Sequence, residues 1–271
     1  MQIKNDRNDA IGVFDSGLGG LTVVKELMRQ LPKEHVVYFG DTARVPYGTK
    51  SKESIVRFSK ENVAILLKHK VKMVVVACNT SSSLALAVLR RKFNLPIIGV
   101  INPGARRAAA ITRNKKVGVI ATAATINSQA YLKSLKRVDR SISVVGKACP
   151  LFVPLAEEGW FDKKSTVDIA EEYLNPLKRA RIDTLILGCT HYPLLKSILN
   201  KVMGDKVQLV DSAQSVVNEV KQLLETTGKS RLSKMPARYK FLVSDQPKHF
   251  RKLAKRFLGY NIKSVQRCDH V

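Results

Sequence analysis

The chain reads Val71-Lys72-Met73-Val74-Val75-Val76-Ala77 and continues with Cys78-Asn79-Thr80. The first part is almost wholly apolar and rich in valine, which is typical of a parallel strand that is covered on both faces. Residues 81–93 have the apolar spacing of a helix, and residues 96–100 predict the next strand. The polar residues 78–80 therefore stand where a buried strand gives way to a helix.

Strands and helices alternate along the rest of the chain. Further strands are expected at 10–14, 35–39, 116–121, 143–145, 183–187, 207–210 and 239–243, and further helices at 21–31, 55–68, 126–135, 167–177, 193–202 and 247–258. Residues 230–237 predict a loop. Alternation of this kind predicts an α/β fold with mainly parallel sheets that are flanked by helices.

A faint internal repeat divides the chain into two halves. Residues 11–16 resemble residues 117–122, and residues 74–80 resemble residues 185–191 at nearly the same spacing. The repeat predicts two similar α/β lobes that face each other across a cleft. Ligands of such sheets bind beyond the carboxyl ends of the strands, and the residues expected there are Ser16, Cys78, Thr122 and Cys189.

The four cysteines, at positions 78, 149, 189 and 268, stand far apart in the sequence. Without a C-x-x-C pair, a zinc site, a redox motif or a disulfide framework is not expected. Cys78 and Cys189 each end a buried strand before an expected helix, whose dipole lowers the pKa of a thiol at its start. One buried cysteine is ordinarily a small core residue, but two in matched settings favour a function. Cys149 and Cys268 lack this setting and are interpreted as structural or surface residues.

Two thiols on opposite sides of a substrate can invert a stereocentre. One thiolate removes a proton from a carbon atom while the opposite thiol supplies a proton to the other face. Backbone N–H groups at helix starts can stabilise the carbanion electrostatically. Since no lysine motif for a pyridoxal Schiff base stands out, no cofactor is expected.

Two further residues are candidates for this chemistry. Asp15, in the segment Phe14-Asp15-Ser16-Gly17-Leu18-Gly19-Gly20, can bind a substrate ammonium group, assist a thiol or cap a helix. His191, two residues after Cys189, can assist that thiol or be an ordinary surface histidine. The glycine segment has neither G-x-G-x-x-G spacing nor a P-loop lysine, which argues against a nucleotide site.

The net charge is +25, from 47 Lys and Arg against 22 Asp and Glu. Such a charge attracts polyanions without specificity. Two interpretations stay open: a solvated basic surface, or a nucleic-acid-binding regulatory protein, although no binding motif or stacking platform accompanies the charge. Residues 1–9 lack the apolar segment of a signal peptide, and the densest apolar run, 73–78, is too short to cross a bilayer, so we expect a cytoplasmic location without membrane contact.

Together these segments resemble the glutamate racemases of the aspartate/glutamate racemase superfamily. The segments that carry the resemblance are 12–22, 40–42, 46–48, 77–80, 149–154 and 188–193. The resemblance implies a two-lobed fold in which residues 1–99 and 208–271 form the first lobe and residues 100–207 form the second. It also implies a homodimer.

For activity, the resemblance implies interconversion of L- and D-glutamate without pyridoxal phosphate or a metal, which supplies D-glutamate for peptidoglycan. Cys78 would take the α-proton of D-glutamate and Cys189 that of L-glutamate, with Asp15 and His191 assisting. The residues that would hold the substrate are Asp15, Ser16, Pro46, Tyr47, Gly48, Asn79, Thr80, Thr122, Thr190 and His191.

Three alternatives remain at this stage. An aspartate racemase would use the same thiol pair, but an acidic residue would then more often stand where His191 follows Cys189-Thr190. A nucleic-acid-binding protein would account for the charge and would bind independently of both thiols. A non-catalytic amino-acid-binding protein would not need two cysteines.

Overall fold

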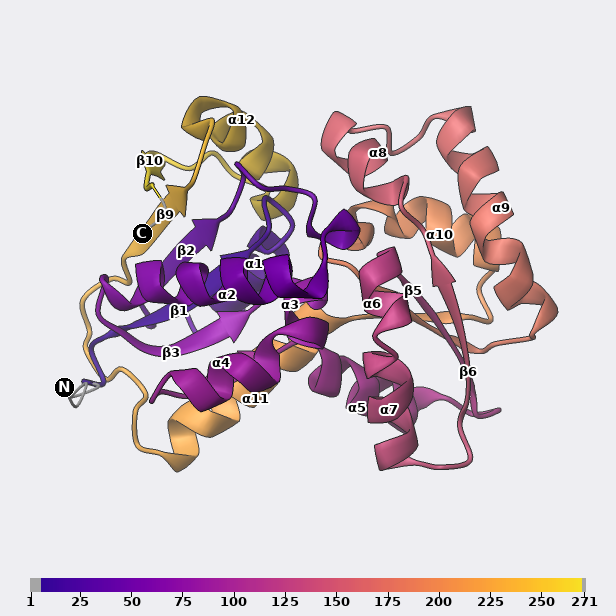
Figure 1. Cartoon of the computed structure of the whole chain (residues 1–271), viewed down its shortest axis with the longest axis horizontal. Helices are drawn as coiled ribbons and strands as arrows, with labels where there is room; N and C mark the ends of the chain where they lie inside the picture. The colour runs from indigo at the N-terminus through magenta and orange to yellow at the C-terminus, as the bar shows by residue number, and fades with distance from the viewer. Residues whose placement is uncertain (1–5, 270–271) are drawn as a thin grey trace. The chain divides into compact units, whose positions relative to one another are not determined.

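The computed structural model describes residues 6–269, and in it the chain divides into two compact units (Figure 1). Residues up to Val100 and from Ala213 onward form the first unit, and Ile101–Ser212 form the second. The expected assignment of residues 208–212 to the first lobe is wrong for these units, because strand β8 (Gln208–Asp211) pairs with a strand of the second. Residues 1–5, part of the opening segment considered above, lie outside the described residues.

The first unit is built on a six-stranded sheet in which every described pairing is parallel. Its strands, in spatial order, are β10 (Gln266–Arg267), β9 (Tyr239–Val243), β2 (Val36–Gly40), β1 (Ala10–Asp15), β3 (Val71–Val76) and β4 (Ile97–Gly99). The central strands β1, β2 and β3 are buried along their whole length, as their apolar sequences predict.

Helices cover both faces of this sheet (Figure 1). The chain moves from β1 to β2 in one direction and from β2 to β3 in the other, so right-handed crossovers place α1 (Leu21–Gln30) and α2 (Lys52–Leu67) on opposite faces. The remaining helices of this unit are α3 (Asn79–Leu84), α4 (Leu86–Lys92), α11 (Ser212–Thr226), which begins at the boundary, α12 (Pro247–Leu258) and the short 3-10 helix η1 (Tyr47–Thr49).

The second unit repeats the plan on a smaller scale. Its four parallel strands have the order β6 (Ser143–Ala148), β5 (Lys116–Ala121), β7 (Thr184–Gly188) and β8. Its helices are α5 (Ile101–Ile111), α6 (Ala123–Asn127), α7 (Ala130–Val138), α8 (Phe152–Glu158), α9 (Lys164–Arg179), the 3-10 helix η2 (Tyr192–Leu195) and α10 (Lys196–Met203).

The two sheets share one strand order, β2-β1-β3-β4 in the first unit and β6-β5-β7-β8 in the second. The repeat seen in the sequence therefore corresponds to β1 with β5 and β3 with β7. Strand β7 shows how both faces are filled: Leu185 and Leu187 pack in one apolar cluster, and Ile186 packs in another. Alternation of this kind is what a strand covered on both faces requires.

Five helical stretches differ from the sequence-based expectation. The helix expected at 81–93 is broken at Ala85 into α3 and α4, where the hydroxyl groups of Ser82 and Ser83 bond to backbone carbonyls. The helix expected at 126–135 is divided by Gln129, which has a left-handed φ of 56°. Helix α5 was missed because Pro103 and Gly104 resemble a turn, although proline is tolerated in the first turn of a helix. Helices α8 and α11 were also missed.

Lys72 interrupts the apolar run of β3 and is nevertheless fully buried. Its Nζ donates hydrogen bonds to Glu34 Oε2 (2.6 Å), to the Arg7 carbonyl (2.8 Å) and to the Lys229 carbonyl (2.9 Å). A buried charge needs such partners. Lys72 therefore fastens the segment after α11 to the amino ends of β1, β2 and β3.

Within residues 6–269 no helix combines the length and the apolar character that a bilayer span requires. The same residues contain no group of three or more His, Cys, Asp or Glu side chains placed to hold a metal ion.

Candidate active site

The register of the first sheet brings Ser16 and Cys78 together. Phe14 of β1 pairs with Val76 of β3, and the next N–H group, that of Ala77, donates to the Phe14 carbonyl at 3.0 Å. Two residues beyond this pair, past the ends of both strands, the Cys78 thiol donates to Ser16 Oγ at 3.8 Å. Both side chains lie beyond the carboxyl ends of adjacent strands, where ligands of such sheets bind.

Cys78 caps the N-terminus of α3 and is only 4% exposed. The helix start was expected to lower the pKa of this thiol, and that expectation is wrong. Burial, and after it the carboxylate of Asp15, raise the pKa of Cys78 to about 12, and the hydrogen bonds from Ser81 and Ser16 offset only part of the rise. The thiol is therefore neutral near pH 7.

Asp15 is the last residue of β1 and is fully buried. Its Oδ2 accepts a hydrogen bond from the Gly17 N–H at 3.1 Å. The next helix, α1, has Gly20 at its N-cap, so Asp15 does not cap it. A Cβ atom on Gly20 would lie 2.6 Å from the Cβ of Asp15, which means that only glycine leaves room for the carboxylate here.

The second sheet repeats this register at Thr122 and Cys189. Ala121 of β5 pairs with Gly188 of β7, so the two following residues come level as Ser16 and Cys78 do. Cys189 is 6% exposed, and Thr122 is half-buried. The Thr122 hydroxyl accepts from the Thr125 N–H at 3.3 Å and so caps helix α6.

His191 lies between Cys189 and an acidic residue, Glu157 of α8. Its Nδ1 is 3.8 Å from the Cys189 sulfur, and its Nε2 is 3.1 Å from Glu157 Oε1. His191 is 2% exposed, which excludes the surface interpretation. Burial by itself would lower its pKa, but Cys189 and Glu157 outweigh burial and raise the pKa of His191 to about 10.

Glu157 is the residue that sequence reasoning missed. It lies 34 positions before His191, on a helix that the periodicity did not predict. The available signal was its place shortly after the segment 149–154, which carries part of the family resemblance.

The two thiols differ in their local setting. Cys78 directly caps an α-helix, whereas Cys189 precedes the 3-10 helix η2, and α10 begins only at Lys196. The helix expected at 193–202 is present, but its first turn belongs to the 3-10 helix η2 and the remainder to α10. The Cys189 sulfur contacts a histidine ring, whereas the carboxylate that raises the pKa of Cys78 is that of Asp15.

The remaining candidates of the first unit lie near Cys78. Asn79 and Thr80 are buried in the first turn of α3, and Tyr47 belongs to the same apolar cluster as Cys78. The hydroxyl of Tyr47 donates to Asp41 and accepts from Asn62 Nδ2 at 3.0 Å, so it points into the protein. The loop around Tyr47 leaves Gly48 half-buried and Pro46 exposed.

In the second unit Thr190 is buried between Cys189 and His191. Cys149 is also fully buried there, but its carbonyl accepts from the Tyr192 hydroxyl at 2.8 Å, and burial raises the pKa of its thiol. Cys268 is partly exposed at the edge of an apolar cluster of the first unit. Neither cysteine has an acid–base partner of the kind that Cys189 has in His191 and Glu157 among the contacts of the described residues.

Comparisons by family, by sequence and by structure all match this chain to racemases. The family described as Asp/Glu/Hydantoin racemase matches residues 11–220. The chain is 50% identical over 256 residues to the glutamate racemase of Geobacter metallireducens, covering 94% of this chain and 95% of the relative. Among solved structures, glutamate racemase isoform RacE1 from Bacillus anthracis superposes with a TM-score of 0.94 at 41% identity, over 97% of this chain and 98% of the other. The glutamate racemase of Francisella tularensis in complex with D-glutamate gives a TM-score of 0.91 at 38% identity, with the same coverage.

Proposed function

The chain belongs to the Asp/Glu/hydantoin racemase family and is an isomerase, and we propose that it interconverts L- and D-glutamate by proton transfer between two cysteines. The observation that carries this mechanism is the pair of equivalent strand ends. Cys78 lies beside Ser16 in the first unit, and Cys189 lies beside His191 in the second. Two thiols at equivalent ends of two similar sheets suit a reaction that must reach both faces of one carbon atom.

In the first unit, Asp15 and Cys78 work as a pair. While the site lacks a cation, the carboxylate helps to keep the thiol protonated. The ammonium group of a bound amino acid next to Asp15 would offset that negative charge and favour the thiolate. The Cys78 thiolate would then accept the α-proton of D-glutamate, and the Cys78 thiol would return a proton in the opposite direction.

In the second unit, His191 assists Cys189. A protonated His191, held by Glu157, stabilises a thiolate at Cys189, which would accept the α-proton of L-glutamate. In the opposite direction, His191 supplies positive charge while Cys189 donates its proton. The role of Glu157 is to keep the imidazole oriented and charged.

Residues at the same strand ends would hold the substrate. In the first unit Ser16 lies beside Cys78, and Asn79 and Thr80 directly follow Cys78 in the chain. Because the Tyr47 hydroxyl is engaged inside the protein, Tyr47 and Gly48 would bind a carboxylate through their backbone N–H groups, with Pro46 shaping the loop. Thr122, Thr190 and His191 would supply the corresponding contacts from the second unit.

The choice of glutamate rests on the relatives and on His191. The relatives named above are glutamate racemases. In the cell, we propose that the enzyme works in the cytoplasm as a homodimer, needs neither pyridoxal phosphate nor a metal, and supplies D-glutamate for peptidoglycan. Aspartate is the alternative substrate.

Exchange of the α-hydrogen in deuterium oxide tests the proposal. Purified protein without added cofactor should replace the α-hydrogen of glutamate with deuterium, followed by NMR, and should racemise it, followed by circular dichroism. Cys78→Ala and Cys189→Ala should each lower racemisation by at least about 10²- to 10⁴-fold, the usual contribution of a general acid or base. Cys268→Ala serves as the matched control and should remain active.

Full racemisation by either variant would refute the two-thiol mechanism. A wild-type protein that exchanges aspartate but not glutamate would refute the substrate and leave the mechanism standing.

A further inference from the structure

Asp41 and Ser244 are the first residues after β2 and β9, which are neighbouring strands of the first sheet. Gly40 pairs with Val243, and the Ser244 N–H donates to the Gly40 carbonyl at 3.1 Å. On the other side, the Asp41 N–H donates to the Asp15 carbonyl at 3.0 Å. The register thus sets Ser244, Asp41 and Asp15 side by side at the carboxyl edge of the sheet.

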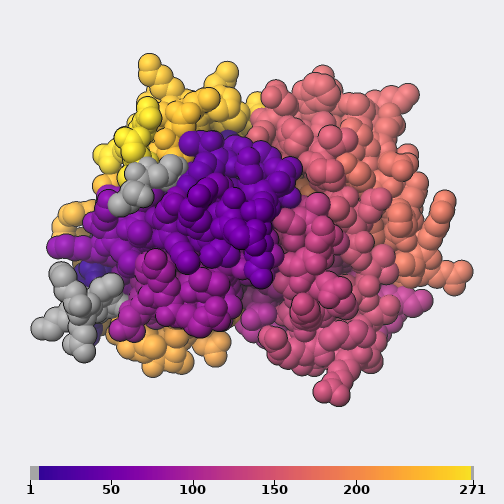
Figure 2. Space-filling model, viewed as in Figure 1, coloured from indigo at the N-terminus to yellow at the C-terminus, as the bar shows by residue number. Residues whose placement is uncertain are grey.

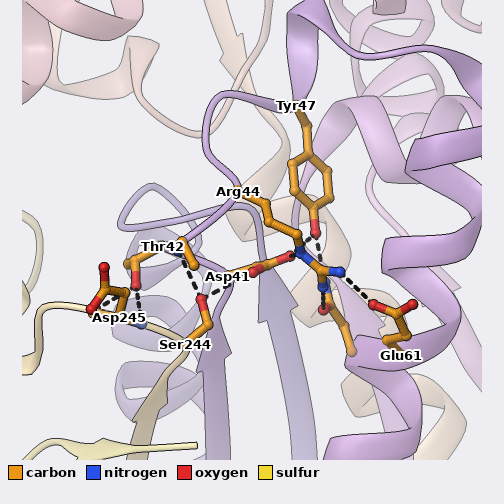
Figure 3. Close-up of polar contacts among 9 residues, drawn as sticks. Asp41, Thr42, Arg44, Tyr47, Glu61, Ser244 and Asp245 are labelled. Carbon is orange, nitrogen blue, oxygen red and sulfur yellow. Dashed lines mark hydrogen bonds and ion pairs between the residues drawn. The ribbon is translucent and has the colours of Figure 1, made fainter. Parts of the chain in front are cut away.

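The carboxylate of Asp41 is fully buried and is shared by three donors (Figure 3). Its Oδ1 accepts from the Ser244 hydroxyl at 3.0 Å. Its Oδ2 accepts from Arg44 Nε at 2.7 Å and from the Tyr47 hydroxyl. Two of these donors belong to the loop that carries Tyr47 and Gly48, and the third belongs to the segment that returns from the C-terminal part of the chain.

A second set of bonds joins the same loop to the same returning segment (Figure 3). The Thr42 hydroxyl donates to the Asp245 carbonyl at 2.6 Å and accepts from the Asp245 N–H at 2.9 Å. The Ala43 N–H donates to Ser244 Oγ at 2.8 Å. The start of the loop is therefore fixed to two consecutive residues just after β9, Ser244 and Asp245.

The far side of the loop rests on helix α2. Arg44 bonds to Glu61, and its guanidinium lies 4.0 Å above the ring of Phe58. The ring of Tyr47 packs against Phe58 at 5.6 Å between centroids. The loop is thereby held between β9 and α2, next to the cluster that contains Cys78.

We infer that Ser244 and Thr42 are positioning residues that hold the loop 42–48 in its substrate-binding conformation through Asp41 and the backbone of Asp245. The inference rests on the proposed function, which places Tyr47 and Gly48 at the substrate carboxylate. A loop that is already ordered binds more tightly, because no binding energy is used to order it. Among the contacts of the described residues neither hydroxyl bonds to Cys78, so the loss of either should change binding and leave the proton transfers intact.

Steady-state kinetics of two variants test the inference. Ser244→Ala removes the bonds to Asp41 and Ala43, and Thr42→Val removes both bonds to Asp245 without changing side-chain size. Each substitution should raise KM for both enantiomers of glutamate by about tenfold, because it removes one or two charge-assisted or paired hydrogen bonds. The kcat should stay within about twofold of the wild-type value. Thr42→Ser keeps the hydroxyl and should restore the wild-type KM.

The control is Thr227→Val, which removes a threonine bond to the Leu223 carbonyl at the end of α11. Its KM should not change. A purely structural effect of Ser244→Ala would lower the fraction of active enzyme, and hence kcat, and would leave KM unaltered.

Hydrogen–deuterium exchange of peptides that cover residues 42–50 gives a readout that does not depend on the activity. In Ser244→Ala and Thr42→Val this segment should exchange at least several-fold faster than in the wild type and in Thr227→Val. Unchanged exchange and unchanged KM would overturn the inference. A wild-type protein that does not racemise glutamate would instead refute the proposed function, and the exchange data would still decide whether the two hydroxyls hold the loop.

Discussion

Replacing Asp15 by asparagine should make Cys78 more reactive while it makes the enzyme less active. The pKa of Cys78 rises from 9.0 to about 12, with burial as the larger cause and Asp15 as the second. Loss of the carboxylate should lower this pKa, and each pKa unit of lowering corresponds to about 1.4 kcal/mol and a tenfold larger thiolate fraction. Nucleophilicity falls as the pKa falls, by a factor of about three per unit. The reactivity of Cys78 should therefore rise by about threefold to fourfold for each pKa unit by which the substitution lowers its pKa.

The assay is alkylation by iodoacetamide at pH 8, with each cysteine followed separately by peptide mass spectrometry. Asp15→Asn should accelerate modification of Cys78 and should lower racemisation, because the carboxylate that binds the ammonium group is lost. Cys189, in the other unit, reports on nonspecific loosening and should keep its rate. Ser16→Ala is the opposite control: it removes a bond that lowers the pKa of Cys78, so alkylation there should slow. An unchanged or slower rate at Cys78 in folded Asp15→Asn would refute the electrostatic argument.

Three further outcomes are expected. Glu157→Gln removes a partner that raises the pKa of His191. A histidine whose pKa is raised on folding stabilises the folded state below pH 6.5, and this stabilisation is lost as the pH rises toward 10. In urea titrations the stability difference from the wild type should thus be about 1 kcal/mol at pH 6.5 and shrink as the pH rises; a constant difference would contradict it. Lys72→Ala leaves Glu34 buried without its cation and should lower the free energy of unfolding by about 3–5 kcal/mol, against less than about 0.5 for exposed Lys25→Ala. Helix α12, which lies at the surface in Figure 2, buries its apolar side chains and exposes its lysines and arginines. The protein should therefore bind duplex DNA weakly, with an affinity that falls steeply with salt and is the same in Cys78→Ala. Binding that is insensitive to salt would exclude simple charge attraction.

Local sequence was enough to locate most of the strands, including the carboxyl ends at which the candidate site residues lie. Buried parallel strands are short runs of apolar residues, and such runs are visible without any knowledge of what they pack against. The prediction of α12 at 247–258 agrees with the structure because its apolar spacing, Pro247 at the start and Gly259 after the end are all local signals. The repeat between the halves added the equivalence of Cys78 and Cys189.

The tertiary structure decided what surrounds those strand ends. The pairing of His191 with Glu157 and that of Asp41 with Ser244 join residues far apart in the chain, and they depend on which strands and helices become neighbours. The raised pKa of Cys78 depends on burial by the whole unit, which outweighs the local effect of the helix start. The sequence by itself thus determined the strands, the repeat and the two thiols. Only the packing of distant segments determined which residues contact those thiols and which residues hold the loop 42–48. Such contacts depend on the order of the strands in the sheet, and the apolar pattern within one strand does not specify that order.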